Sequence, residues 1–236
     1  MIFQGAEFSR LIIVFVSQSF IIVVLSILGF KILKRNRKRA QISLFLFYIL
    51  LVLGLVLNIA FVLLTPTNDE VLLRTFYIMS SFFIIFPFIF NLLFINIMLK
   101  MEEVFTVPKM IVIVIAYGVG CFSLYLIPDG IVFSPTWVPT YSFTLFIVIY
   151  VYFTVFMTIP TLFYFFRFYR MFEAQNLKKR YRLYFIGIII IMVIMYGGIY
   201  FITTNNQFFK TVYGLFGFVF EIVAGFLVYY GVGKNL

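Results

Sequence analysis

The sequence contains no histidine and only one cysteine, Cys121. An intrachain disulfide is therefore excluded, and the commonest metal ligand and general base is missing. Only 11% of the 236 residues are charged. No G-x-x-x-x-G-K-[ST] or G-x-G-x-x-G loop is present to bind phosphates. We therefore predict no catalytic site, no metal site and no cofactor.

Apolar residues dominate what is present. They make up 64% of the chain, 35 residues are phenylalanine, and the mean hydropathy is +1.15. These values lie far outside those of a soluble globular domain. A bilayer core takes about 20 apolar residues per helix. Runs of about that length cover residues 11–32, 41–64, 72–98, 110–127, 141–166, 183–203 and 210–232.

These runs predict an all-α membrane protein, a seven-transmembrane-helix bundle that forms a single domain over residues 1–236. The first run lacks a basic leader and a small-residue cleavage pattern, and the basic stretch KRNRKR follows it at once. We therefore expect a retained first helix and not a signal peptide. The expected localisation is the cell membrane, as a multi-pass protein.

The basic residues are distributed asymmetrically. All but three of the 18, the exceptions being Arg10, Arg74 and Lys210, follow odd-numbered runs. The positive-inside rule therefore places the N-terminus outside and the C-terminus in the cytoplasm. This placement explains the net charge of +10 better than nucleic-acid binding, which needs a basic face on a soluble surface.

Two clusters account for much of this basic charge. Both are interpreted as topology determinants that contact anionic lipids at the cytoplasmic face, or as a docking site for a separate protein partner. The clusters comprise Lys34, Arg35, Arg37, Lys38, Arg39, Lys178, Lys179, Arg180 and Arg182.

One acidic residue, Glu221, interrupts an apolar run, in the stretch GLFGFVFEIVAG. Gly214, Gly217 and Gly225 share a helix face with it, whereas Phe216, Phe220, Val223 and Phe226 occupy the other side. Small residues let a neighbouring helix approach closely. The carboxyl group is therefore predicted to point into the bundle, and the phenylalanines toward lipid.

No basic residue lies at the depth of Glu221, so burial favours a neutral carboxyl group that donates or shares a hydrogen bond. The partners expected near the same level are Gln18, Tyr117, Thr154 and Tyr196. Two interpretations stay open. Glu221 is either a structural hydrogen-bonding group between helices or part of a ligand or proton site.

Two prolines lie inside predicted spans, Pro87 in the third and Pro160 in the fifth. Each removes a backbone hydrogen bond and is expected to kink its helix. They serve either as hinges or as packing elements. The loop IPDGIVFSPTWVPT carries the only tryptophan, Trp137, as an interfacial anchor or as part of a lid over a cavity.

Several membrane activities lack the residues that they need. Helix seven has no internal lysine for retinal, because Lys210 lies at its outer end. Asp69 and Asp129 both fall in loops, which excludes a membrane-embedded aspartyl protease site. Serine hydrolysis of the rhomboid type would need a histidine base. The sequence therefore favours a protein without enzymatic activity.

The segment FYRMFEAQNLKKRYRLYFIGIII, residues 168–190, has an aromatic and basic helix exit, a polar bridge and a basic entry followed by a small residue. With seven helices and an outside N-terminus, it resembles the seven-helix sensor region of some receptor histidine kinases. The resemblance implies a bundle that senses a small or lipophilic ligand. Since no output domain precedes Leu236, a separate cytoplasmic partner is expected to receive the signal.

Two other functions are compatible with the same outline. Sugar transporters of the PQ-loop type share the span count and a three-plus-one-plus-three repeat, and alternating access would use Pro87, Pro160 and Glu221. The chain has no Pro-Gln pair, which counts against that family. An accessory subunit of a membrane complex would instead use the small-residue face of the last helix as an oligomer surface.

Overall fold

The computed structural model describes residues 13–35, 38–98, 106–171 and 175–233, and almost all of them are helical. Arg37, within the first basic cluster, lies outside these ranges, as do Arg10, Lys100 and Lys234. The elements are η1 (Ile13–Gln18), α2 (Ser19–Arg35), α3 (Arg39–Leu64), η2 (Thr65–Thr67), α4 (Glu70–Ile85), α5 (Phe88–Met98), α6 (Val107–Ser123), η4 (Leu124–Leu126), β1 (Ile131–Phe133), β2 (Pro139–Tyr141), α7 (Phe143–Phe153), η5 (Thr154–Thr158), α8 (Ile159–Met171), α9 (Gln175–Thr203), α10 (Gln207–Val228) and η6 (Tyr229–Gly233).

Seven helical stretches of the described chain are long and apolar enough to cross a membrane, which confirms the predicted number. One helix extends beyond its predicted apolar run. The sixth long helix, α9, begins at Gln175, about two turns before the run that starts near residue 183. The prediction followed the apolar run, whereas lysine and arginine are good helix formers and continue the helix beyond it.

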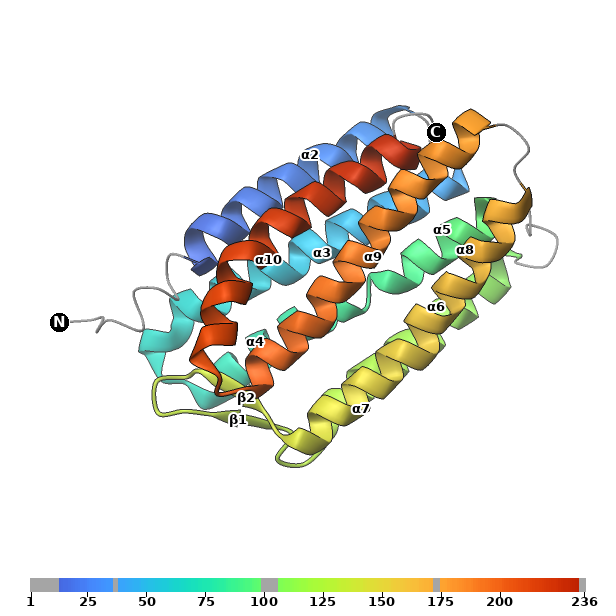
Figure 1. Cartoon of the computed structure of the whole chain (residues 1–236). Helices are drawn as coiled ribbons and strands as arrows, with labels where there is room; N and C mark the ends of the chain where they lie inside the picture. The colour runs from blue at the N-terminus through green and yellow to red at the C-terminus, as the bar shows by residue number, and fades with distance from the viewer. Residues whose placement is uncertain (1–12, 36–37, 99–105, 172–174, 234–236) are drawn as a thin grey trace.

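The long helices lie roughly along one direction, and their connections gather at the two ends (Figure 1). We call one end the hairpin end, because it carries β1, β2 and the turn between α3 and α4. The other is the basic end, where α2 and α8 end and α3 and α9 begin. Helices α3, α2, α10 and α9 lie side by side in that order. Helix α3 contacts α2, α2 contacts α10, and α10 contacts α9.

The third long helix, α4 with α5, is the most enclosed. Within its apolar stretch 61% of the residues are buried inside the bundle, against 17% for the fourth long helix. It contacts α3, α6 and α8. A change in this helix therefore reaches most of the bundle directly.

This central helix is interrupted at Pro87. Phe86 and Pro87 form a turn, after which Phe90 N–H bonds to the Pro87 carbonyl at 2.9 Å. Proline has no N–H to donate to the carbonyl of Phe83, four residues earlier. The predicted distortion at Pro87 is thus a full break between α4 and α5.

Pro160 accompanies a milder irregularity. A π-helical turn, η5, precedes α8, which begins one residue before the proline. A single π-turn widens the helix without ending it. The predicted distortion of the fifth span is therefore present, and it lies on the N-terminal side of Pro160.

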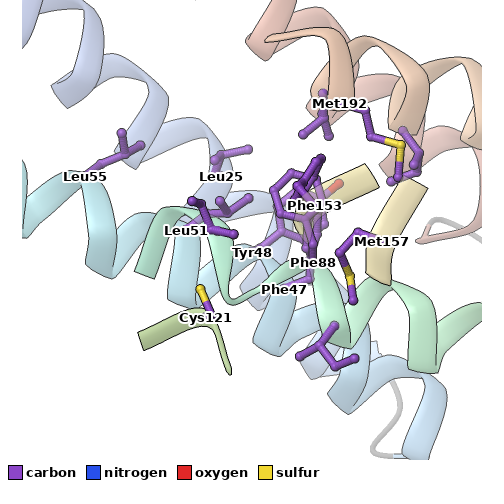
Figure 2. Packing of buried hydrophobic residues seen from close by; sticks show 14 of the residues in the cluster. Leu25, Phe47, Tyr48, Leu51, Leu55, Phe88, Cys121, Phe153, Met157 and Met192 are labelled. Carbon is purple, nitrogen blue, oxygen red and sulfur yellow. The ribbon is translucent and has the colours of Figure 1, made fainter. Parts of the chain in front are cut away.

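The packed core surrounds Phe88, the first residue of α5 (Figure 2). The ring of Phe88 packs edge-on against Phe47 of α3 at 5.6 Å and against Phe153 of α7 at 4.8 Å. All three side chains are fully buried, and Met157 and Met192 complete the cluster. The residue that follows the helix break thus joins α3, α5 and α7.

Two glycines allow helices to approach closely. A Cβ atom at Gly54 would lie 2.9 Å from the Phe83 carbonyl carbon, so α3 touches the backbone of α4 just before the break. The hydroxyl group of Ser80 donates to the Gly54 carbonyl at 2.8 Å in the same place. A Cβ atom at Gly187 would lie 2.9 Å from the carbonyl oxygen of Ala224, where α9 crosses α10.

Candidate functional site

Glu221 lies on the inward face of α10. Gly217 and Gly225, one turn to either side, are buried, and Glu221 is half-buried between them. The predicted lipid-facing residues on the other side are exposed, namely Phe216, Phe220, Val223 and Phe226. The face that the spacing assigns to Glu221 therefore agrees with the packing of the helix.

The turns that flank Glu221 pack against apolar side chains. Phe218 meets Phe20 of α2 edge-on at 6.0 Å, and a Cβ atom at Gly225 would approach Leu25 at 3.1 Å. Tyr48 of α3 donates its hydroxyl group to the Gly225 carbonyl at 3.0 Å. Within the described residues Glu221 makes no hydrogen bond and no ion pair. Among the described residues the acid therefore has no hydrogen-bond or ion-pair partner, and the polar group that interacts with it electrostatically is Tyr213, two turns earlier in α10.

The four predicted partners of Glu221 are engaged elsewhere. Asn58 of α3 donates to the Gln18 side-chain oxygen at 3.1 Å. The Tyr196 hydroxyl group is 2.6 Å from Thr154 Oγ1 and 2.7 Å from Thr158 Oγ1. These contacts link η1 to α3 and η5 to α9, and neither includes α10.

Tyr117 of α6 belongs to a third group. Its hydroxyl group lies 3.5 Å from the Ile85 carbonyl, at the last residue of α4, and its own carbonyl accepts a 2.8 Å bond from Tyr152. Its ring stacks on Tyr152 at 5.4 Å. The structure therefore divides the predicted site around Glu221 into separate clusters, of which the Tyr117 cluster touches the break in the central helix.

A β-hairpin, formed by β1 and β2, packs against α4, the N-terminal half of that central helix. Its strands pair in antiparallel register, with Ile131 opposite Tyr141 and Phe133 opposite Pro139. The turn closes through the Trp137 N–H and the Ser134 carbonyl at 2.9 Å. The sequence prediction treated this segment as a loop, because its strands are only three residues long.

Trp137 fastens this hairpin to the rest of the bundle. Its indole N–H donates to Asn68 Oδ1 at 2.9 Å, in the turn between α3 and α4. Its backbone has a φ of 58°, a left-handed conformation that costs a bulky residue about 1–2 kcal/mol. Glycine would avoid that cost, so the side-chain contacts of Trp137 must offset it.

A groove of about 430 Å³ opens along the hairpin. It is lined by Glu70, Arg74, Asp129, Ile131, Val132, Phe133, Ser134, Pro135 and Trp137. Arg74 pairs with Glu70 at 3.3 Å, and its guanidinium group lies 5.5 Å from the centre of the Phe133 ring. The groove thus presents one cation, two carboxylates and aromatic surface together.

Beneath the groove lies a buried tyrosine cluster. Phe133 packs edge-on against Tyr77 at 5.5 Å, and Tyr77 meets Tyr141 at 6.3 Å. Tyr141 donates to Ser81 Oγ at 3.3 Å. Burial raises the pKa of Tyr141, although its hydrogen bonds to Ser81 and neighbouring tyrosines lower it in part. Tyr141 is therefore a neutral hydroxyl group that holds β2 on α4.

Sequence reasoning missed this cluster. Tyr77, Ser81 and Ile85 follow one another at four-residue spacing and so share a face of α4, which was the available signal. Tyr141 is 60 residues from Ser81 in the chain, and a single sequence gives no indication of that contact.

Polar contacts continue from the break toward the basic end. Ser43 of α3 donates to the Phe90 carbonyl at 2.7 Å. Tyr184 of α9 donates to Asn91 Oδ1 at 2.5 Å, and both side chains are fully buried. A Cβ atom at Gly231 would lie 2.5 Å from the Tyr184 nitrogen, so η6 also rests against this residue. Helix α5 is thus attached to the helix that leads to the basic end.

The basic clusters are on the surface. Lys34, Arg35, Lys38, Arg39, Lys179, Arg180 and Arg182 are exposed, and Lys178 is half-buried. Arg182 donates to the Tyr169 hydroxyl group at 2.9 Å, and this hydrogen bond lowers the pKa of Tyr169. The two helices α8 and α9 are therefore joined by a charged contact where they leave the apolar region.

We expect Asn68→Gly to release the hairpin. Asn68 has a φ of 53°, so glycine keeps the backbone conformation while the acceptor for Trp137 is lost. Since Trp137 is the only tryptophan, its emission should shift to longer wavelength as the ring gains water. Val132→Ala, an exposed change on β1, is the control and should leave the spectrum unchanged. Identical spectra for Asn68→Gly and the wild type would show that the contact does not hold the hairpin.

No group of three or more metal-ligating acids, cysteines or histidines occurs in the part of the chain that the structure describes. The chain was also compared with protein-family models, with curated proteins and with solved structures, and it matches none of them.

Proposed function

We propose that this protein is a seven-helix receptor of the cell membrane, with the hairpin end outside and the basic end in the cytoplasm. Seven long apolar helices and the exposed apolar side chains on their outer faces support membrane insertion. The concentration of lysine and arginine at one end supports the orientation. The protein has no catalytic role in this proposal.

One observation carries the receptor proposal: side-chain contacts link the hairpin groove to Ser81 of α4, and this helix continues from Ser81 for one turn to the break. Phe133 in the groove contacts Tyr77, which meets Tyr141, and Tyr141 bonds to Ser81 of α4. Ile85, one turn beyond Ser81, is the last residue of α4 and is bonded by Tyr117. A ligand that displaces the hairpin would therefore act on the central helix, which is interrupted at Pro87 between α4 and α5.

The groove favours a small ligand that carries both charge and apolar surface. Arg74 would attract an acidic group, and Glu70 and Asp129 a basic one, while Phe133 and Trp137 supply aromatic contact. A ligand that competes with Glu70 for Arg74 would also disturb the position of Arg74 over the Phe133 ring. Ligand binding at Arg74 would thus affect Phe133, the groove residue that contacts Tyr77 of the tyrosine cluster.

The output would pass through the second half of the central helix. Phe88 wedges between Phe47 and Phe153, and Asn91 holds Tyr184 of α9. A rotation of α5 relative to α4 would therefore move α9 and the basic residues at its start, Lys178 to Arg182. A separate cytoplasmic protein would read that movement.

Cysteine labelling tests the membrane placement. Starting from Cys121→Ser, we would introduce Thr136→Cys in the hairpin turn or Asn176→Cys at the start of α9, both exposed positions. In intact cells an impermeant maleimide should label only the first, and the second only after permeabilisation. The reverse pattern would invert the orientation, and labelling of both in intact cells would contradict the seven-span topology.

Transport is the second candidate, and Glu221 is the observation that favours it. A half-buried acid that makes no hydrogen bond or ion pair within the described residues is a candidate proton or ion site. The accessory role is less well supported, because Gly225, at one end of the small-residue face of α10, is already packed against α2 and α3. That end of the face is not free to serve as an oligomer surface.

Glu221→Gln separates these roles. If the carboxyl group is neutral in the receptor, glutamine should leave the unfolding midpoint close to that of the wild type and should preserve ligand-dependent changes in Trp137 emission. A proton-coupled transporter would instead lose proton uptake, measured with a pH-sensitive dye in proteoliposomes. Proton uptake by the wild type that vanishes in Glu221→Gln would overturn the receptor proposal in favour of transport.

A further inference from the structure

A second groove, of about 590 Å³, lies on the surface of α8. It is lined by Phe163, Phe166, Arg167 and Arg170. Their spacing of three, one and three residues places all four side chains on one helix face. This face combines aromatic and cationic groups near the basic end of the bundle.

The other face of α8 supplies its contacts with the protein. Phe165 is buried and stacks on Tyr181 of α9 at 5.1 Å, and Tyr169 accepts the bond from Arg182. Phe163 and Phe166, by contrast, are 61% and 55% exposed, although one edge of the Phe166 ring also meets Phe185 of α9 at 6.2 Å. The groove therefore faces away from the bundle, where lipid would surround a membrane helix.

The order of the residues along the helix matches an amphiphile. The two phenylalanines lie within the apolar stretch, which ends at Arg167, and Arg170 lies one turn beyond it. Acyl chains would contact the aromatic rings, while the guanidinium groups would meet a phosphate at headgroup level. Neither arginine forms an ion pair with another residue in the described ranges, and the nearby Glu173 falls outside them.

We propose that this groove binds one anionic glycerophospholipid. The site depends on the membrane placement described above and goes beyond the receptor role. Because α8 continues from the π-turn η5 and leads to the connection with α9, a bound lipid would hold the output end of the fifth long helix in place. Two arginines on one face allow bidentate contacts to the phosphate, which a diffuse basic surface would not provide.

Native mass spectrometry of the purified full chain in detergent tests this site. Phosphatidylglycerol and phosphatidylcholine with identical acyl chains would be titrated separately. We expect phosphatidylglycerol to bind the wild type about tenfold more tightly or better, and the double variant Arg167→Gln with Arg170→Gln to lose that preference. Lys31→Gln with Lys109→Gln removes the same charge from exposed positions outside both the groove and the two basic clusters, and it should stay within about twofold of the wild type.

Three outcomes would overturn the proposal. Equal losses in both double variants would show diffuse attraction and no defined site. An unchanged preference in the groove variant would place the lipid elsewhere. Displacement of the lipid by millimolar inorganic phosphate, with stabilisation of the protein by phosphate alone, would make the groove a site for soluble anions. Cysteine labelling of Thr136→Cys and Asn176→Cys in each variant reports the topology separately, so a failure of the membrane placement is distinguishable.

Discussion

Replacement of Phe88 by alanine should lower the free energy of unfolding by about 3 kcal/mol, among the largest losses for any single truncation in the chain. Phe88 is fully buried, and its ring packs between those of Phe47 of α3 and Phe153 of α7. Its removal leaves a cavity that neighbouring helices cannot fill without moving α5. The measurement is reversible unfolding in mixed micelles with increasing sodium dodecyl sulfate.

Phe216→Ala provides the matched control, because the same atoms are removed from a side chain that is 56% exposed on α10. Since lipid or detergent replaces the lost contacts there, we expect a change within about 0.5 kcal/mol. Equal losses for the two variants would mean that Phe88 is not at a packed junction, and the proposed link between the two halves of the central helix would fail with it.

Gly187→Ala should destabilise the contact between α9 and α10 by about 1–3 kcal/mol. The new Cβ atom would lie 2.9 Å from the Ala224 carbonyl oxygen and 3.0 Å from the Val228 nitrogen, both in the backbone of α10. A backbone cannot turn aside as a side chain does, so the helices must separate. The same unfolding measurement reports the loss.

Gly217→Ala is the control for close approach, because Gly217 lies in α10, the partner helix of α9. The three heavy atoms nearest to the new Cβ atom would belong to the Tyr213 ring, at 3.5 Å or more, which is an ordinary contact. We therefore expect little change or a slight gain, since alanine is the better helix former. If Gly217→Ala proved as damaging as Gly187→Ala, helix propensity or an unseen contact would have to replace close approach as the explanation.

The sequence allowed the long helices to be predicted, because length and apolar content suffice to recognise a span. The orientation of α10 about its axis was also predictable, since Gly217, Glu221 and Gly225 recur at helical spacing. Both properties depend on residues close together in the chain. A kink at Pro87 was predicted in the same way from the missing N–H of proline, and the structure has a full break there.

Contacts between distant residues were not predictable. Gln18, Tyr117, Thr154 and Tyr196 were grouped with Glu221 by depth alone, but depth does not determine which side of the bundle a residue occupies. The hairpin was missed because each strand has three residues, and Trp137 occupies a backbone conformation that usually marks glycine. The tyrosine cluster depends on the hairpin and was missed with it.

These contacts explain how the proposed receptor would transmit a change from the hairpin end to the basic end. The hairpin end contains a groove with unlike charges. In the proposed receptor the tyrosine cluster would transmit the position of the hairpin to α4, and the break at Pro87 would let α5 move relative to α4. The close contact of Gly54 with Phe83 fixes the half before the break, whereas Asn91 and Tyr184 tie the half after it to α9. The two halves of one helix can therefore adopt different relative orientations.

Hydrogen exchange of the full chain in lipid nanodiscs tests this coupling most directly. Asn68→Gly would be compared with the wild type and with Val132→Ala. The account predicts that releasing the hairpin increases exchange not only in β1 and β2 but also in α5 and the first half of α9, around Asn91 and Tyr184. Increased exchange confined to the hairpin, with α5 and α9 unchanged, would contradict it.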